Sequence, residues 1–137
     1  CSADEKSYRW TRRIGAEQLD GLVNREYPVG RITSIQPGDR GVSGRLKWVT
    51  VKGTKSTATI RKELPIRQAF GDLPSAMLII KEERGPSGPV AWTFMGGGRG
   101  HGVGLCQHGA RGMALKGSTH DAIVMHYFSG STLVTVR

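Results

Sequence analysis

Alternating hydrophobic and polar positions predict a series of short β-strands along the chain. The segments with this pattern, which are rich in β-branched residues, are 8–14, 31–35, 44–51, 57–61, 76–81, 90–94 and 133–136. A stretch rich in turn-forming Gly and Pro separates 76–81 from 90–94, so these two segments are expected to pair as a hairpin.

Apolar residues at helical spacing and residues typical of helix ends predict four short helices between or after these strands. They lie at about 16–23, 64–70, 105–116 and 118–127. In the first of these segments, Leu19, Leu22 and Val23 share one face. Ser118 with Asp121 three residues later resembles a capping box at the start of the last segment. The fold class predicted is α+β: a mostly antiparallel β-sheet, three to four short helices, and a glycine-rich loop that leads into a helix.

Size and charge narrow the class of protein. The 137 residues have room for one domain, and 20 Lys and Arg against 11 Asp and Glu give a formal charge of +9. Such an excess favours polyanions such as nucleic acid, teichoic acid, anionic membrane or cell wall. The basic residues are scattered, so no nucleic-acid motif is visible, and a solvated basic surface explains the charge as well. No run approaches the roughly 18 apolar residues that span a bilayer.

The two cysteines, Cys1 and Cys106, do not fix a redox compartment. Cys1 followed by Ser2 fits the start of a mature lipoprotein, and it fits the start of a fragment equally well. The sequence alone therefore leaves targeting open.

Residues 96–104 form a glycine tract, with six glycines in nine positions and with Arg99 and His101 between them. Glycine at this density weakens a strand or helix, but it permits positive φ and close approach of the backbone to a neighbour. Three interpretations compete: a turn between strand and helix, a phosphate loop, and a cleft wall for a neutral polymer such as a glycan. The spacing matches neither G-x-G-x-x-G nor the end of a P-loop, so the phosphate loop is the weakest. In a glycan cleft, backbone amides, His101 and Gln107 would supply hydrogen bonds.

The glycine tract and the residues after it resemble the signature of the SpoIID/LytB family. The family pattern is G-H-G-V-G-M-S/C-Q-x-G-A, then a helix, then I-L-x-H-Y-Y-P-G-T-x-L, and residues 94–133 follow it. Upstream segments also match the family in order: Tyr8-Arg9-Trp10, Gly30-Arg31-Ile32, Ser43-Gly44-Arg45, Ile66-Arg67 and Pro74-Ser75-Ala76. The departures are mild, with Leu105 in place of Met and Phe128-Ser129 in place of Tyr-Pro. The resemblance covers nearly the whole chain.

The resemblance implies one of two functions in peptidoglycan remodelling and sporulation. One is a lytic transglycosylase, a lyase that cleaves the MurNAc–GlcNAc linkage and leaves a 1,6-anhydro product. The other is an enhancer of a cell-wall amidase. A noncatalytic cell-wall-binding module is a further alternative.

The transglycosylase reaction needs one glutamate with a raised pKa, which acts first as acid and then as base. In the family this glutamate lies upstream in a Glu-Met-Pro segment followed by an Ala-Gln-Ala helix, and neither is found here. Glu26-Tyr27-Pro28 and Glu63-Leu64-Pro65 imitate the tripeptide, but both are expected to be solvated charges of the scaffold. We therefore expect residues 1–137 to be the C-terminal part of a single SpoIID-type domain without a catalytic residue. Whether this chain is itself an enzyme stays open.

The resemblance also implies that the glycine tract and its neighbours form one wall of a substrate cleft. The residues implied for substrate binding are His101, Gln107, Arg99, Gly100, Gly102, Tyr127, Ser43 and Arg45, the glycines through their backbone amides. They would recognise hydroxyl and N-acetyl groups and position the upstream glutamate. Tyr127 offers either a stacking face for a sugar ring or a core aromatic, and Ser43 and Arg45 are the weaker candidates.

No cofactor and no metal are expected. His101, Cys106 and His108, together with Cys1, offer imidazole and thiolate groups, but their spacing matches no standard zinc site. The family pattern also allows serine at position 106, which argues against a metal that depends on this thiol.

The partners implied are peptidoglycan glycan strands and either the N-terminal part of the same domain or a cell-wall amidase. Nucleic acid is not expected. The location implied is extracytoplasmic, at the cell envelope, with a membrane anchor or a lipoprotein left open.

Overall fold

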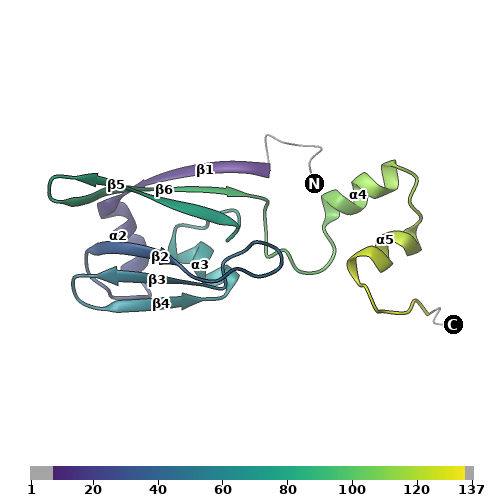
Figure 1. Ribbon diagram of the computed structural model, residues 1–137, viewed down its shortest axis with the longest axis horizontal. Coiled ribbons are helices and arrows are strands. Elements are labelled where there is room, and N and C mark those ends of the chain that lie inside the picture. Colours follow the sequence, from purple (N-terminus) through teal and green to yellow (C-terminus); the bar gives the residue numbers. More distant parts are fainter. Residues whose placement is uncertain (1–7, 135–137) are drawn as a thin grey trace. The chain divides into compact units, whose positions relative to one another are not determined.

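Two antiparallel sheets dominate the computed structural model, which describes residues 8–134 (Figure 1). One three-stranded sheet has the order β1-β6-β5 and the other has the order β2-β3-β4. The strands are β1 (Arg9–Gly15), β2 (Ile32–Pro37), β3 (Trp48–Gly53), β4 (Thr57–Arg61), β5 (Leu78–Gly85) and β6 (Gly88–Gly97). The described helices are α2 (Ala16–Asn24), α3 (Glu63–Ala69), α4 (Gln107–Leu115) and α5 (His120–Tyr127).

The chain divides into two units after His101. The first, called the sheet unit, holds both sheets with α2 and α3 and is described over residues 8–101. The second, called the helical unit, holds α4 and α5 and is described over residues 102–134.

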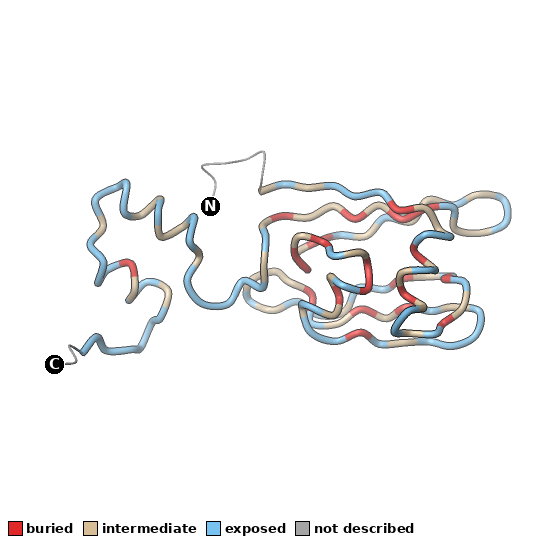
Figure 2. Tube along the Cα trace, turned by 180° about the vertical axis from the view of Figure 1, so that it is seen from behind, coloured by how far each residue is buried: buried red, intermediate tan, exposed pale blue. Residues whose placement is uncertain are grey.

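The core of the sheet unit draws on both sheets and both helices. Trp92 and Phe94 point inward from β6, and the ring centroid of Phe94 lies 5.0 Å from that of Phe70. Leu19 and Val23 add the apolar face of α2. Figure 2 shows buried positions recurring along the strands of this unit, as expected for sheets with one covered face. Each large buried side chain contributes roughly 1.5–3 kcal/mol.

The helical unit has little core of its own. Ile123, at 9% exposure, is its single buried residue between 102 and 134. Leu115 and Phe128 keep 77% and 45% of their surface exposed. Burial of apolar area therefore contributes much less to this unit than to the sheet unit.

The α+β class with antiparallel sheets is confirmed, and β4 and the β5–β6 hairpin lie where the sequence predicts them. Several predicted starts are shifted: β5 begins at Leu78 rather than 76, β6 at Gly88 rather than 90, and α4 at Gln107 rather than about 105.

Two further starts are wrong for a local reason. β3 begins at Trp48 rather than at residue 44, because the chain turns at Gly41–Gly44. In this turn Gly44 N donates to Gly41 O, and the φ angle of Gly44 is 74°. The last helix is capped by Thr119 rather than Ser118, since the Thr119 hydroxyl accepts from Ala122 N at 3.3 Å.

The predicted final strand is also wrong as far as it is described. Residues 133 and 134 form no strand, and residues 135 and 136 lie outside the described residues.

Candidate functional site

Strand β6 carries the start of the glycine tract out of the first sheet. Gly96 is paired with Trp10 on β1 and with Leu78 on β5. A Cβ at Gly96 would stand 2.2 Å from the Trp10 ring and 2.7 Å from the carbonyl oxygen of Met77. Only glycine fits here, because neighbouring atoms of the protein occupy the space of a side chain.

Hydrogen bonds from distant segments fix the backbone after Gly96. The hydroxyl of Ser75, which is fully buried, donates to Gly97 O at 2.7 Å. The indole N–H of Trp10 donates to Gly98 O at 3.1 Å, and Gly98 N donates to Tyr8 O at 2.7 Å.

The next glycine of the tract is fixed in the same way. Gly100 N donates to Pro74 O at 2.9 Å, and Arg45 Nε donates to Gly100 O at 3.0 Å. The amide of Gly100, predicted to meet substrate, is therefore engaged within the protein. The side chains of Arg99 and His101 are exposed. In this part of the tract the amides of Gly98 and Gly100 are engaged, whereas the side chains of Arg99 and His101 are accessible.

Residues 73–76, which include the tract's partners Pro74 and Ser75, are bonded in turn to side chains of α3. Arg67 Nε donates to Leu73 O at 2.6 Å, and its guanidinium lies 3.4 Å from the carboxylate of Glu63. Glu63 also accepts from Ala76 N at 3.3 Å. The expectation that Glu63 is a solvated charge is wrong, since its side chain is only 15% exposed and pairs with Arg67. Glu26 is exposed, as expected.

Five predicted site residues thus lie in the sheet unit. Arg45 contacts the glycine tract directly. Ser43 is half-buried in the turn just before Arg45. Arg99, Gly100 and His101 belong to the tract itself. The three-residue segments that resemble the family at 8–10, 43–45 and 74–76 all reach this one place.

The other predicted residues lie in the helical unit. Gly102 is exposed with φ 68°, and Gln107 is the exposed first residue of α4. Tyr127 is half-buried, and its hydroxyl would lie 2.0 Å from a Cβ placed at Gly109. The packing of Tyr127 on the bare backbone of α4 supports the core-aromatic alternative.

Cys106 is the N-cap of α4. Its sulfur accepts from Gly109 N at 3.4 Å. Serine is a preferred residue at such a position, which gives a physical reason for the serine in the family pattern. Between residues 8 and 134 no group of three or more His, Cys, Asp or Glu side chains could hold a metal, and Cys1 lies outside that range.

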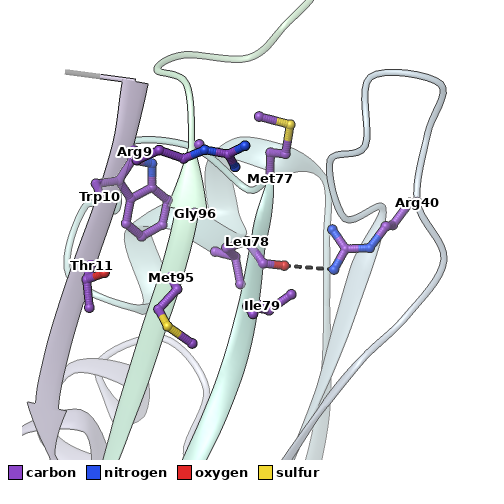
Figure 3. Close-up of a pocket in the computed structure, with 10 residues that line it drawn as sticks. Arg9, Trp10, Thr11, Arg40, Met77, Leu78, Ile79, Met95 and Gly96 are labelled. Carbon is purple, nitrogen blue, oxygen red and sulfur yellow. Dashed lines mark hydrogen bonds between the residues drawn. The ribbon is translucent and has the colours of Figure 1, made fainter. Parts of the chain in front are cut away.

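A shallow groove on the outer face of the first sheet was not predicted. It has a volume of about 330 Å³ and runs from Arg9 past Met95 to Ile79 (Figure 3). Gly97 also lines it. The sequence contains an apolar residue at an outward position of β5 (Ile79) and of β6 (Met95). That the two are neighbours follows only from the register of the strands.

Comparisons with known proteins identify relatives of the chain. Residues 2–104 match the family described as a domain of unknown function (DUF8618). Stage II sporulation protein D of Bacillus subtilis (strain 168) is 32% identical over 136 residues, 95% of this chain and 35% of that protein. Stage II sporulation protein D of Bacillus amyloliquefaciens is 33% identical over 102 residues, 74% of this chain and 25% of that protein. The amidase enhancer of Bacillus subtilis (strain 168) is 39% identical over 44 residues, 32% of this chain and 6% of that protein.

The chain thus spans 35% or less of the length of these curated relatives. The relatives confirm the resemblance carried by the glycine tract. The chain belongs to the SpoIID/LytB family, that of stage II sporulation protein D and the amidase enhancer, and to the family described as domain of unknown function DUF8618.

Proposed function

We propose that the complete protein remodels peptidoglycan outside the cytoplasm, as a lytic transglycosylase of the glycan strands, and that this chain forms a wall of the substrate cleft. The names of the relatives, which refer to sporulation and to an amidase, support a role at the cell wall. None of the helices between residues 8 and 134 has the length and apolarity that crossing a membrane requires.

The observation that carries the proposal is the fixed backbone of the glycine tract. Trp10, Arg45 and Ser75 are far apart in the sequence, yet each donates a hydrogen bond to a carbonyl of the tract. A rigid backbone places Arg99 and His101 at defined positions, and a preorganised set of donors binds a polar polymer at a lower entropy cost. Imidazole and guanidinium groups suit the hydroxyl and acetamido groups of a glycan.

The acid of this reaction is proposed to lie outside the described residues. A general acid in such a cleft needs a raised pKa. Four carboxylates of the sheet unit are engaged within the protein: Glu63 pairs with Arg67, Glu83 with Arg13 and Glu82 with Arg84, and Asp20 accepts from Ile32 N. The hydrogen bond from Arg13 lowers the pKa of Glu83, the opposite of what an acid catalyst requires.

The test compares the 137-residue chain with the complete protein. Each is incubated with purified peptidoglycan, and 1,6-anhydro products are measured by mass spectrometry. The complete protein is expected to release them, and the chain alone is not. Abundant anhydro product from the chain alone would show that the acid is among these residues. If neither releases product, the transglycosylase proposal is wrong.

An amidase enhancer is the second candidate. The observations that favour it are the relative that bears this name and an apolar, arginine-rimmed groove suited to a protein partner. The same peptidoglycan digestion with a cell-wall amidase added separates the two. An enhancer raises the release of stem peptides by the amidase and forms no anhydro sugar.

A further inference from the structure

The outer face of the first sheet is apolar where it borders the glycine tract. The strand register places Thr11, Met95 and Ile79 in one row across β1, β6 and β5. Ile79 keeps 53% of its surface exposed. Met77, just before β5, and Gly97 extend this row to the start of the glycine tract. Thr11, Met95, Ile79, Met77 and Gly97 are called the floor of the groove. An exposed isoleucine beside two flexible methionine side chains is a surface that adapts to apolar side chains of a partner.

Two arginines, Arg40 and Arg9, lie at the edge of the groove. Arg40 donates to Gly44 O and to Leu78 O, each at 2.7 Å. The Nη1 atom of Arg9 lies 3.4 Å from the position of a Cβ on Gly97, and its guanidinium carbon lies 5.2 Å from the centre of the Tyr8 ring. Figure 3 shows both side chains beside the groove. Two backbone carbonyls therefore fix the position of Arg40, whereas Arg9 is exposed and its guanidinium lies beside the Tyr8 ring.

The ion pairs found between residues 8 and 134 include neither Arg9 nor Arg40. Glu83, the acidic residue on the outer face of β5, is already paired with Arg13 at 2.7 Å. The chain as a whole carries a formal charge of +9. A segment with carboxylates near Arg9 and Arg40 would complement this face.

The floor does not suit a sugar. Trp10 is the aromatic residue in the lining of the groove. Its ring packs against the core and lies against Gly96. Stacking on a sugar needs an open aromatic face, which this groove does not present. The floor of Met and Ile instead suits aliphatic side chains.

We propose that this groove docks a short acidic segment of a partner protein, one that places an aliphatic side chain over Met95 and Ile79 and carboxylates near Arg9 and Arg40. Its volume of about 330 Å³ lies at the small end of the ~300–1,000 Å³ typical of ligand sites. It therefore accommodates few side chains, and weak, transient binding of a single segment is expected. This binding is independent of glycan cleavage.

The experiment measures fluorescence anisotropy of labelled peptides with the 137-residue chain. The probe is an extended peptide that alternates Asp with Leu. One control peptide has Ser in place of each Leu, and a second control ligand is poly(glycerol phosphate), an anionic polymer without aliphatic side chains. The Asp-Leu peptide is expected to bind at least ~10-fold more tightly than the Asp-Ser peptide.

Variants then locate the site. Ile79→Asp and Arg9→Glu are each expected to weaken the Asp-Leu peptide at least ~10-fold. Arg31→Glu makes the same change of charge at another exposed position and is expected to change affinity less than ~3-fold. If Ile79→Asp does not fold, Arg9→Glu against Arg31→Glu decides.

Two results would overturn the proposal. One is equal binding of the Asp-Leu peptide, the Asp-Ser peptide and the polymer, which would reduce the effect to general attraction of anions. The other is an equal loss in Arg9→Glu and Arg31→Glu. Neither result bears on the release of anhydro sugars, so failure here and failure of the proposed function are distinguishable.

Discussion

The glycines at the start of the tract are explained by contacts within the protein. Gly96 makes room for Trp10, and a Cβ on Gly97 would lie 3.0 Å from Met77 and 3.2 Å from Tyr8. Close approach to a ligand is therefore not needed to account for these two positions. Gly100 differs, because no atom lies within 4 Å of its missing Cβ and its φ is 73°. There glycine serves the backbone conformation.

Gly96→Ala is predicted to destabilise the sheet unit by at least about 2 kcal/mol. The added methyl group meets the Trp10 ring and a backbone oxygen, and the latter cannot rotate away. Gly21→Ala is the matched control, since Gly21 lies within α2 with no atom within 4 Å, and it should stabilise by about 0.5–1 kcal/mol. Thermal unfolding followed by circular dichroism measures both. Equal melting temperatures for the two variants would contradict the packing described at Gly96.

Cys106 is predicted to act as a helix cap rather than as a metal ligand. Cys106→Ser should keep or increase the protection of the Gly109 amide from hydrogen exchange, whereas Cys106→Ala should lose it, with a cost of about 1 kcal/mol. Exchange measured by NMR gives the protection, and elemental analysis of the same samples gives the metal content. Stoichiometric zinc that disappears in Cys106→Ser would show that the thiol is a ligand.

The alternation of hydrophobic and polar residues identifies the strands but does not show which strands pair. The alternation along β1 separates inward Trp10 and Ile14 from outward Thr11 and Arg13. The register that brings Arg13 opposite Thr93 and near Glu83 depends on contacts 70 residues apart, which no local pattern contains. The groove on this face shares that dependence, so it could be found only in the folded chain.

The ion pair of Arg13 and Glu83 is predicted to give the sheet a small dependence on acid. The Arg13 hydrogen bond, followed by that of Thr93, lowers the pKa of Glu83. A lowered pKa means that the stabilisation is complete above the unfolded pKa of the carboxyl and is lost as pH falls through the folded one. The pair is exposed, so the effect should be small and weaken with salt.

Thermal unfolding of wild type and Glu83→Gln over a range of pH tests this. The difference in melting temperature should be present at neutral pH and shrink as the pH falls and the Glu83 carboxyl takes up a proton. Glu26→Gln, which makes the same change at an exposed position, serves as the control. A difference for Glu83→Gln that is unchanged in acid would assign its effect to packing instead of charge.

The sequence predicts the glycine tract but not the distant residues that fix its backbone in the folded chain. The motif at 96–104 stands out because glycine at that density is unfavourable in regular structure. The bonds from Trp10 to Gly98 and from Arg45 to Gly100 span 88 and 55 residues, so Trp10 could not be identified as an anchor and Arg45 ranked as a weak candidate. The role of Glu63 was missed for the same reason, because its partner on the loop, Ala76, becomes a neighbour only on folding.

If the fixed tract presents His101 to a glycan strand, the complete protein carrying His101→Ala should turn over peptidoglycan more slowly. Release of 1,6-anhydro products and melting temperature are measured on the same preparation, with His120→Ala as a control whose side chain is 81% exposed on α5. Because the His101 side chain is exposed and is not part of the core, its removal should leave the protein folded, which the melting temperature checks. Loss of a hydrogen bond to substrate, worth roughly 1–2 kcal/mol, should lower turnover about 10-fold, while His120→Ala stays near wild type. Wild-type turnover in folded His101→Ala protein would contradict this role of His101.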